Sequence, residues 1–207
     1  DKPDDTQYSY TLEQRVKDLE DLMLHLNVVQ PLTLVLHDWG GMIGMTYAVR
    51  HPEKIQRLII LNTAAFHLPP QKNLPWALWL CRNTWLGAFL VQHFNAFSRG
   101  ASYVCCTRKP LSKELRLAYC APYHPKENRI ATLRFVQDIP LQPSDWGYEI
   151  ITEVQSQLKL FRKHPVLICW GAKDFVFDHH FLELWKHYFP QAQIHLFSDC
   201  GHYILED

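Results

Sequence analysis

Short apolar runs alternate with amphipathic segments along much of the chain. Four short runs each predict a strand; they are residues 32–36, 57–61, 166–170 and 193–197, and the first two are expected to be buried. Leucines recur at helical spacing over residues 12–26, where Thr11 and Gln14 suggest a capping box, and further helices are expected over residues 41–50 and 178–188. This alternation predicts a parallel sheet covered by helices on both faces.

The middle of the chain breaks this rhythm. Residues 68–163 hold many prolines between helical, Trp-rich stretches, and this composition predicts an inserted helical lid. Residues 1–67 and 164–207 are then the first and second parts of an α/β core. The most apolar window, residues 76–91, is interrupted by Arg82, so we interpret it as a buried or substrate-facing helix and not as a membrane span.

Composition excludes several classes of protein. Apolar residues make up 47% of the chain, which predicts an ordered globular protein. Lys and Arg number 21 and balance 21 Asp and Glu, so no net charge favours nucleic acid or an anionic membrane surface. The six cysteines form no CxxC pair, which indicates free thiols and a cytoplasmic location.

A tight turn with a central carboxylate follows the first predicted strand, at residues 37–41. A turn between a buried strand and a helix projects one side chain above the carboxyl edge of a sheet, as the nucleophile elbow of hydrolases does. That side chain is Asp38, and Gly40 and Gly41 allow a close approach of the next backbone. A carboxylate nucleophile attacks an electrophilic carbon and forms an ester. Taken alone, the turn also fits an ordinary helix N-cap.

Two more residues stand where the partners of such a nucleophile belong. Asp174 and His202 each follow one of the last two predicted strands. The chain order of nucleophile, acid and histidine is typical of α/β-hydrolases. We therefore predict a triad of Asp38, Asp174 and His202, with Asp178 as the alternative acid.

Trp39 and the pair His179 and His180 each allow two interpretations. Trp39 is either a core aromatic residue or the donor of an indole N–H to a leaving anion or oxyanion. The two histidines suggest a metal, but no third ligand accompanies them at a suitable spacing, so we interpret them as solvated helix residues. We predict neither a metal site nor a cofactor.

The elbow and its flanks resemble the haloalkane dehalogenase-like branch of the α/β-hydrolases. The similarity runs through residues 37–44, 50–53 and 61–66, and residues 135–141 resemble the lid of that branch. The resemblance implies an α/β-hydrolase fold, a mostly parallel doubly wound sheet with an inserted helical lid, whose N-terminal strands are missing here. We expect such a fragment to be insoluble or inactive alone, because the strand that begins at Leu32 would expose an apolar edge.

Four stretches resemble the β-lactone decarboxylases of bacterial long-chain olefin synthesis; they are residues 94–100, 119–123, 174–178 and 199–203. This resemblance implies conversion of a cis-3,4-dialkyl-oxetan-2-one to a cis-alkene and CO₂. Asp38 would engage the lactone ring, Trp39 would help to hold the developing carboxylate, and residues 74–80 and 85–91 would line a tunnel for alkyl chains. It also implies a small hydrophobic substrate and an assembly with a thiolase-like condensing enzyme and a β-lactone synthetase.

The residues leave other activities open. A haloalkane dehalogenase would use Asp38 to displace a halide. An epoxide hydrolase would need two lid tyrosines as proton donors, for which Tyr103, Tyr119 and Tyr123 are candidates. A non-catalytic hydrolase-fold scaffold is the alternative from another class, although all three triad positions are occupied by suitable residues. A serine esterase conflicts with an aspartate at the elbow.

Overall fold

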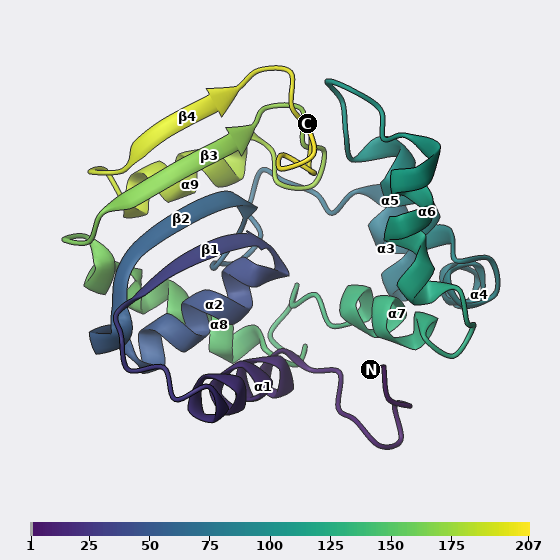
Figure 1. Cartoon of the computed structure of the whole chain (residues 1–207), viewed down its shortest axis with the longest axis horizontal. Helices are drawn as coiled ribbons and strands as arrows, with labels where there is room; N and C mark the ends of the chain where they lie inside the picture. The colour runs from purple at the N-terminus through teal and green to yellow at the C-terminus, as the bar shows by residue number, and fades with distance from the viewer. Residues whose placement is uncertain (1) are drawn as a thin grey trace.

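The computed structural model describes residues 2–207, and at its centre is a sheet of four parallel strands in the order β1-β2-β3-β4 (Figure 1). The strands are β1 (Leu32–Asp38), β2 (Ile55–Thr63), β3 (Val166–Gly171) and β4 (Gln193–Phe197). All four predicted strands are confirmed. The register places Ile60 of β2 beside Leu36 of β1 and Ile168 of β3, so apolar side chains of neighbouring strands form a continuous row on one face.

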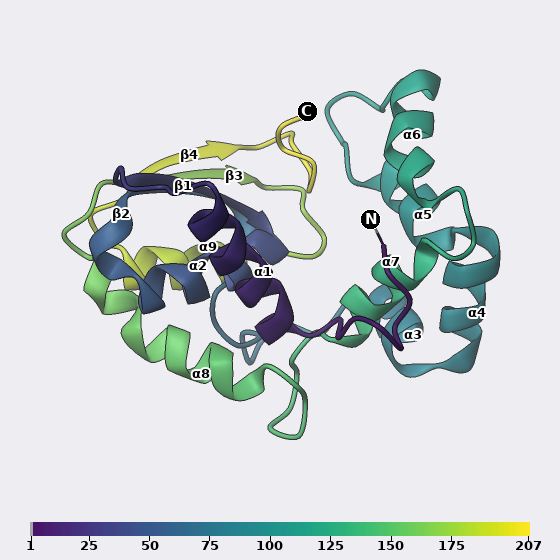
Figure 2. The same ribbon diagram turned by 60° about the horizontal axis from the view of Figure 1, so that its bottom comes forward.

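Helices pack against that face of the sheet. They are α1 (Leu12–His25), α2 (Trp39–Arg50), α8 (Tyr148–Gln157) and α9 (His179–Tyr188). Figure 2 shows α2, α8 and α9 on one side of the sheet and no helix on the other. Within residues 2–207 the second face therefore lacks helices, and the side chain of Val35 on it is 59% exposed. The prediction of helices on both faces is met on one face only.

The start of α1 differs from a capping box. The hydroxyl of Thr11 accepts a hydrogen bond from the backbone N–H of Gln14 at 3.3 Å, as predicted. The side-chain amide of Gln14, however, donates to Asp18 at 2.8 Å and does not return to Thr11. The second half of the predicted box, in which the Gln14 side chain would accept from the Thr11 N–H, is wrong because that side chain turns to donate to the charged carboxylate of Asp18, one turn further on.

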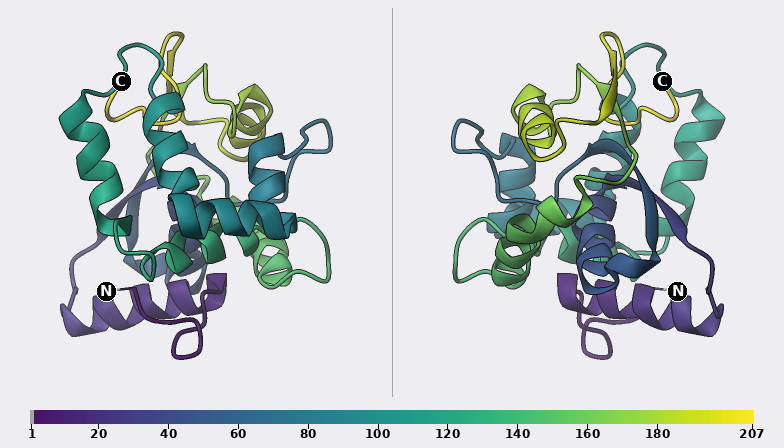
Figure 3. Two further views of the ribbon diagram at one scale, coloured as in Figure 1. Left: turned by 90° about the vertical axis from the view of Figure 1, so that its right-hand side faces the viewer. Right: turned by 90° about the vertical axis from the view of Figure 1, so that its left-hand side faces the viewer.

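A second group of helices stands over the carboxyl ends of the strands (Figures 1 and 3). It comprises α3 (Trp76–Asn83), α4 (Trp85–Phe94), α5 (Ala96–Val104), α6 (Lys113–Cys120) and α7 (Arg129–Gln137). The single helix predicted over residues 76–91 is wrong. The chain breaks at Thr84, whose hydroxyl caps α4 by accepting from the N–H of Gly87 at 3.0 Å. Trp76 and Trp85 are 79% and 80% exposed, so this window is not wholly buried.

Helix α8 lies within residues 68–163 of the sequence but packs with the helices that cover the sheet. Ile151 and Val154 on it are fully buried and join the cores beneath α1 and α2. Short 3-10 turns complete the chain at Pro52–Lys54, Ala121–Tyr123 and Leu158–Phe161. The division of the chain into residues 1–67, 68–163 and 164–207 stays a prediction. None of the helices that the structure describes combines the length and apolar character needed to cross a bilayer.

Candidate active site

Asp38 ends β1 in a strained backbone conformation. Its φ of 49° and ψ of −126° lie where residues other than glycine are rare, and the bend leads directly into α2. The hydroxyl of Thr63 donates to the Asp38 carbonyl. A Cβ at Gly41 would lie 2.1 Å from the Thr63 hydroxyl and 2.4 Å from the Ala64 carbonyl oxygen, so only glycine fits there. The predicted close approach is thus confirmed at Gly41, whereas Gly40 faces open space.

The imidazole of His202 lies between two carboxylates. Its Nδ1 donates to Oδ2 of Asp174 at 2.8 Å, and its Nε2 is 4.0 Å from Oδ1 of Asp38. The other oxygen of Asp174 accepts from the backbone N–H groups of Val176, at 2.7 Å, and Phe177, at 3.1 Å. Asp174 is therefore fixed by three hydrogen bonds, and it can hold the imidazole with Nε2 directed at Asp38.

Asp178, the alternative acid, is engaged elsewhere. One of its oxygens accepts from the N–H of His180 at 3.0 Å and caps α9, and the other pairs with the ammonium of Lys72 at 2.8 Å. The structure brings Asp174 to the imidazole instead. Side-chain ligand atoms of Asp178, His179 and His180 lie within 4.8 Å of one another. The Lys72 ammonium already occupies the carboxylate that a metal ion would need.

The two histidines of the site have shifted pKa values in opposite directions. Burial lowers the pKa of His202, but the hydrogen bond and charge of Asp174, together with the charge of Asp38, outweigh burial and raise it. Burial and the neighbouring His202 lower the pKa of His37. Neutral His37 can donate from Nε2 to the carbonyl oxygen of His202, 2.8 Å away. The site thus favours a proton on His202 and not on His37.

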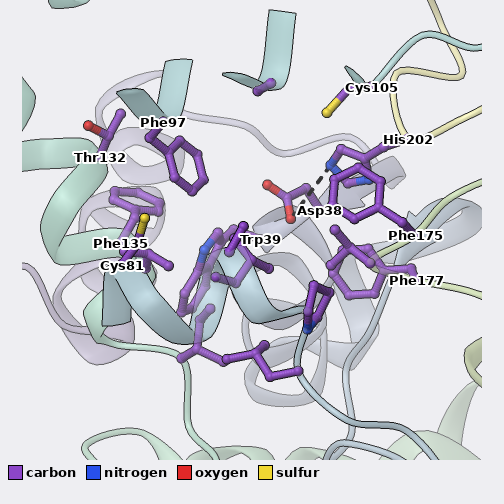
Figure 4. Close-up of a pocket in the computed structure, with 18 of the residues that line it drawn as sticks. Asp38, Trp39, Cys81, Phe97, Cys105, Thr132, Phe135, Phe175, Phe177 and His202 are labelled. Carbon is purple, nitrogen blue, oxygen red and sulfur yellow. Dashed lines mark ion pairs between the residues drawn. The ribbon is translucent and has the colours of Figure 1, made fainter. Parts of the chain in front are cut away.

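Asp38, Trp39 and His202 line one cavity of about 880 Å³ (Figure 4). The side chain of Asp38 is 46% exposed. The rest of the lining is mostly apolar and comes from α3, α5, α7 and the loop after β3; it includes Leu80, Phe97, Phe135, Val136, Phe175 and Phe177. A cavity of this size and character suits a largely apolar small molecule held against one polar group.

Trp39 fits both of its interpretations. It begins α2, lines the cavity next to Asp38 and also packs against the buried cluster beneath α1. Its ring meets that of Phe135 edge-on, with centroids 5.6 Å apart and an interplanar angle of 85°. The indole therefore forms part of the cavity wall and is supported from behind by the core.

The three lid tyrosines considered for an epoxide hydrolase are not gathered together around the cavity. Tyr123 lines it, but Tyr103 is 66% exposed, and the hydroxyl of Tyr119 donates to Glu206 at 2.6 Å. Tyr203 lines the cavity too and was not a candidate. Two tyrosines thus line the cavity, but only Tyr123 belongs to the predicted lid, so the pair of lid tyrosines is not formed.

Sequence reasoning missed two buried residues near Asp174 and His202. Asn62 exchanges hydrogen bonds with the backbone of Gly171, and a polar amide at the end of an apolar strand is a sequence feature that could have revealed it. Cys105 lines the cavity, and burial, with smaller effects from Asp174 and Asp38, raises the pKa of its thiol to about 12. No local pattern marks Cys105. All six cysteines are free.

The chain is similar to known proteins over its whole length. A family model described as the alpha/beta hydrolase fold matches residues 1–207. A cis-3-alkyl-4-alkyloxetan-2-one decarboxylase of Shewanella oneidensis is 61% identical over 207 residues, which are 100% of this chain and 65% of that relative. A relative of the same name from Xanthomonas campestris is 45% identical over 212 residues, covering 100% of this chain and 70% of that protein.

Solved structures agree with the fold. The haloalkane dehalogenase DbeA from Bradyrhizobium elkani superposes with a TM-score of 0.81 at 21% identity, covering 100% of this chain and 71% of that one. The identity to this neighbour is low, so it supports the architecture alone. The chain spans 65% of the length of its Shewanella relative. With the family model matching every residue, the chain belongs to the α/β hydrolase fold family.

Proposed function

We propose that the protein to which this chain belongs converts cis-3,4-dialkyl β-lactones to cis-alkenes and CO₂, with Asp38 as the nucleophile. One observation carries the proposal: a carboxylate stands at a hydrolase elbow, 4.0 Å from Nε2 of His202, in an apolar cavity. The names of the Shewanella and Xanthomonas relatives specify loss of CO₂ from an oxetan-2-one with alkyl groups at positions 3 and 4.

The proposed reaction needs neither water nor a cofactor. The Asp38 carboxylate attacks ring carbon C4 and breaks the C4–O bond, which forms an ester and frees a carboxylate on C3. The bond between C3 and that carboxylate then breaks and releases CO₂. Its electron pair forms the alkene and expels the Asp38 carboxylate, so the enzyme is regenerated. Inversion at C4 followed by anti elimination converts a cis lactone to a cis alkene.

The neighbours of Asp38 have distinct proposed roles. His202, held by Asp174, faces the nucleophile and orients its carboxylate for attack. The indole N–H of Trp39 donates to the carboxylate that ring opening releases. The apolar lining takes the two alkyl chains, and most of it comes from α3 to α7 of the predicted lid, residues 68–163.

Haloalkane dehalogenation is the second candidate, because it also begins with an aspartate attacking carbon. The two activities differ in the fate of the ester. A dehalogenase ester is cleaved by water that a histidine activates, which places a solvent oxygen on the aspartate. The ester proposed here is expelled by decarboxylation, and Asp38 keeps both of its oxygens.

The test offers the full-length protein a cis-3,4-dialkyl β-lactone and a 1-bromoalkane side by side in H₂¹⁸O. Alkene and CO₂ should form from the lactone, without ¹⁸O in the Asp38 peptide after a single turnover with enzyme in excess. Asp38→Asn should abolish alkene formation, and Asp21→Asn, at an exposed site on α1, should leave it unchanged. Bromide release without alkene, or full activity of Asp38→Asn, would refute the proposal.

We also propose a setting for the intact enzyme. A strained β-lactone must be made by another enzyme, so we place the protein beside a β-lactone synthetase and a thiolase-like condensing enzyme, in one assembly. The free thiols support a reducing compartment, and we propose the cytoplasm. Co-elution of the three proteins in size-exclusion chromatography, at a mass above that of each alone, tests the assembly. Separate elution of all three contradicts it.

A further inference from the structure

Arg15 is a buried cation directly behind the cavity wall. It lies in the first turns of α1 and is 6% exposed. Its Nη1 donates to Oδ2 of Asp138 at 2.8 Å, and its Nη2 donates to the carbonyl oxygen of Tyr10 at 2.7 Å. Both side chains of the ion pair are nearly inaccessible, at 5% and 7% exposure. Removing both charges of such a pair from water costs free energy, so the pair contributes little to folding stability. We therefore looked for a role of Arg15 in the site.

The guanidinium contacts two rings that line the cavity. Its Cζ lies 3.6 Å from the ring centroid of Phe135 and 4.7 Å from that of Trp39. The Nε of Arg15 is buried without a hydrogen-bond acceptor among the described residues, as expected for a group covered by aromatic rings. Trp39 is the residue after the nucleophile, and Phe135 lies on α7.

The side chain of Arg15 thus contacts residues from two other parts of the molecule, the elbow and the end of α7. Arg15 comes from α1, Trp39 from the elbow, and Phe135 and Asp138 from α7 and the residue after it. A planar guanidinium with two fixed hydrogen bonds has one orientation, so it can hold the two rings in one orientation. We propose that Arg15 is a positioning residue, which holds the indole of Trp39 at the cavity wall beside Asp38 and is itself anchored to the lid side by Asp138.

The inference rests on the proposed function, in which Trp39 stabilises the carboxylate released from the lactone. A small displacement of the indole should therefore slow turnover more than it weakens substrate binding. Arg15 acts through Trp39 in this account and does not touch the substrate. The loss caused by removing Arg15 should accordingly disappear once Trp39 itself is gone.

The test uses a pair variant, Arg15→Met/Asp138→Leu, in the full-length protein. Replacing both partners with apolar residues leaves no stranded charge, so the variant should fold. We expect kcat to fall about tenfold with a smaller change in KM. In a Trp39→Phe background the same pair variant should lower kcat less than about twofold. Arg50→Met, which breaks the part-exposed ion pair to Glu13 at the opposite end of α2 from Trp39, should leave kcat near the wild-type value.

Unchanged kcat in a folded pair variant, or equal losses with and without Trp39, would overturn the proposal. A second measurement does not depend on turnover. The emission of Trp39, taken as the difference between each protein and its Trp39→Phe counterpart, should change in the pair variant and not in Arg50→Met. Failure of the wild-type enzyme to form alkene would refute the proposed function, whereas unchanged Trp39 emission would refute the role of Arg15.

Discussion

Asn62 and Gly171 exchange two hydrogen bonds between the ends of β2 and β3. The amide of Asn62 donates to the Gly171 carbonyl oxygen at 3.0 Å and accepts from the Gly171 N–H at 2.8 Å. The same amide reaches the carbonyl oxygen of Phe177 at 3.3 Å. One fully buried side chain thus holds both ends of the loop that carries Asp174.

Replacing Asn62 with Leu should destabilise the protein and misplace Asp174. The backbone N–H and C=O of Gly171 would be left buried without these partners, at a cost of about 3 kcal/mol. Urea unfolding of the full-length protein measures this loss. Asn128→Leu, which removes an exposed hydrogen bond to Pro122, should cost less than about 1 kcal/mol. Equal effects of the two changes would contradict the importance of the buried bonds.

Gly171 should tolerate no side chain, because it packs against the histidine loop. A Cβ there would lie 2.3 Å from the carbonyl oxygen of Gly201, next to His202. Gly171→Ala should therefore displace His202 and reduce turnover at least about tenfold. A Cβ at Gly100, an exposed position inside α5, meets nothing within 4 Å. Gly100→Ala should raise the unfolding free energy by up to about 1 kcal/mol. Wild-type kcat in Gly171→Ala would contradict this account.

The raised pKa of His202 predicts a pH dependence of stability. Because the pKa is higher in the folded protein than in the unfolded chain, proton uptake by His202 favours folding. That stabilisation is fully present below the unfolded pKa and is lost as the pH rises through the folded pKa. Asp174→Asn removes the hydrogen bond and charge that raise the pKa, so burial should then lower it.

The stability difference between the wild type and Asp174→Asn should consequently grow as the pH falls from about 8 to about 6. Urea unfolding at several pH values measures it, and an NMR titration of His202 reports the pKa itself. Asp21→Asn, at an exposed site, serves as the control. A pH-independent difference, or an unaltered His202 titration in Asp174→Asn, would show that Asp174 does not set this pKa.

Cys105 should be inert although it lines the cavity that holds Asp38. A thiol reacts as its thiolate, and a pKa of about 12, raised mainly by burial, keeps Cys105 protonated near pH 8. Iodoacetamide at that pH should leave Cys105 unmodified in the native protein and modify it in urea, as peptide mass spectrometry would detect. Rapid native modification would contradict the prediction. An inert thiol here would also avoid acylation by the proposed β-lactone substrate.

Local sequence patterns predicted those parts of the site that depend on single strands and on the turns that follow them. The buried strands were evident as β-rich apolar runs, and the chain order of Asp38, Asp174 and His202 followed from the turns after them. A parallel sheet brings the carboxyl ends of its strands to one edge, so residues after different strands meet there. The need for glycine at position 41 was also predictable, because a sharp turn from a strand into a helix requires close backbone contact.

Sequence alone therefore determined the elbow, the carboxylate of Asp38 at its bend, and the chain order of Asp38, Asp174 and His202. Tertiary structure decided that Asp174 and not Asp178 reaches His202, and that Arg15 packs against Trp39. Each of these outcomes depends on which of several competing partners packing brings within hydrogen-bond distance. The contact of Arg15 with Asp138 spans 123 residues, and no periodicity encodes a separation of that kind.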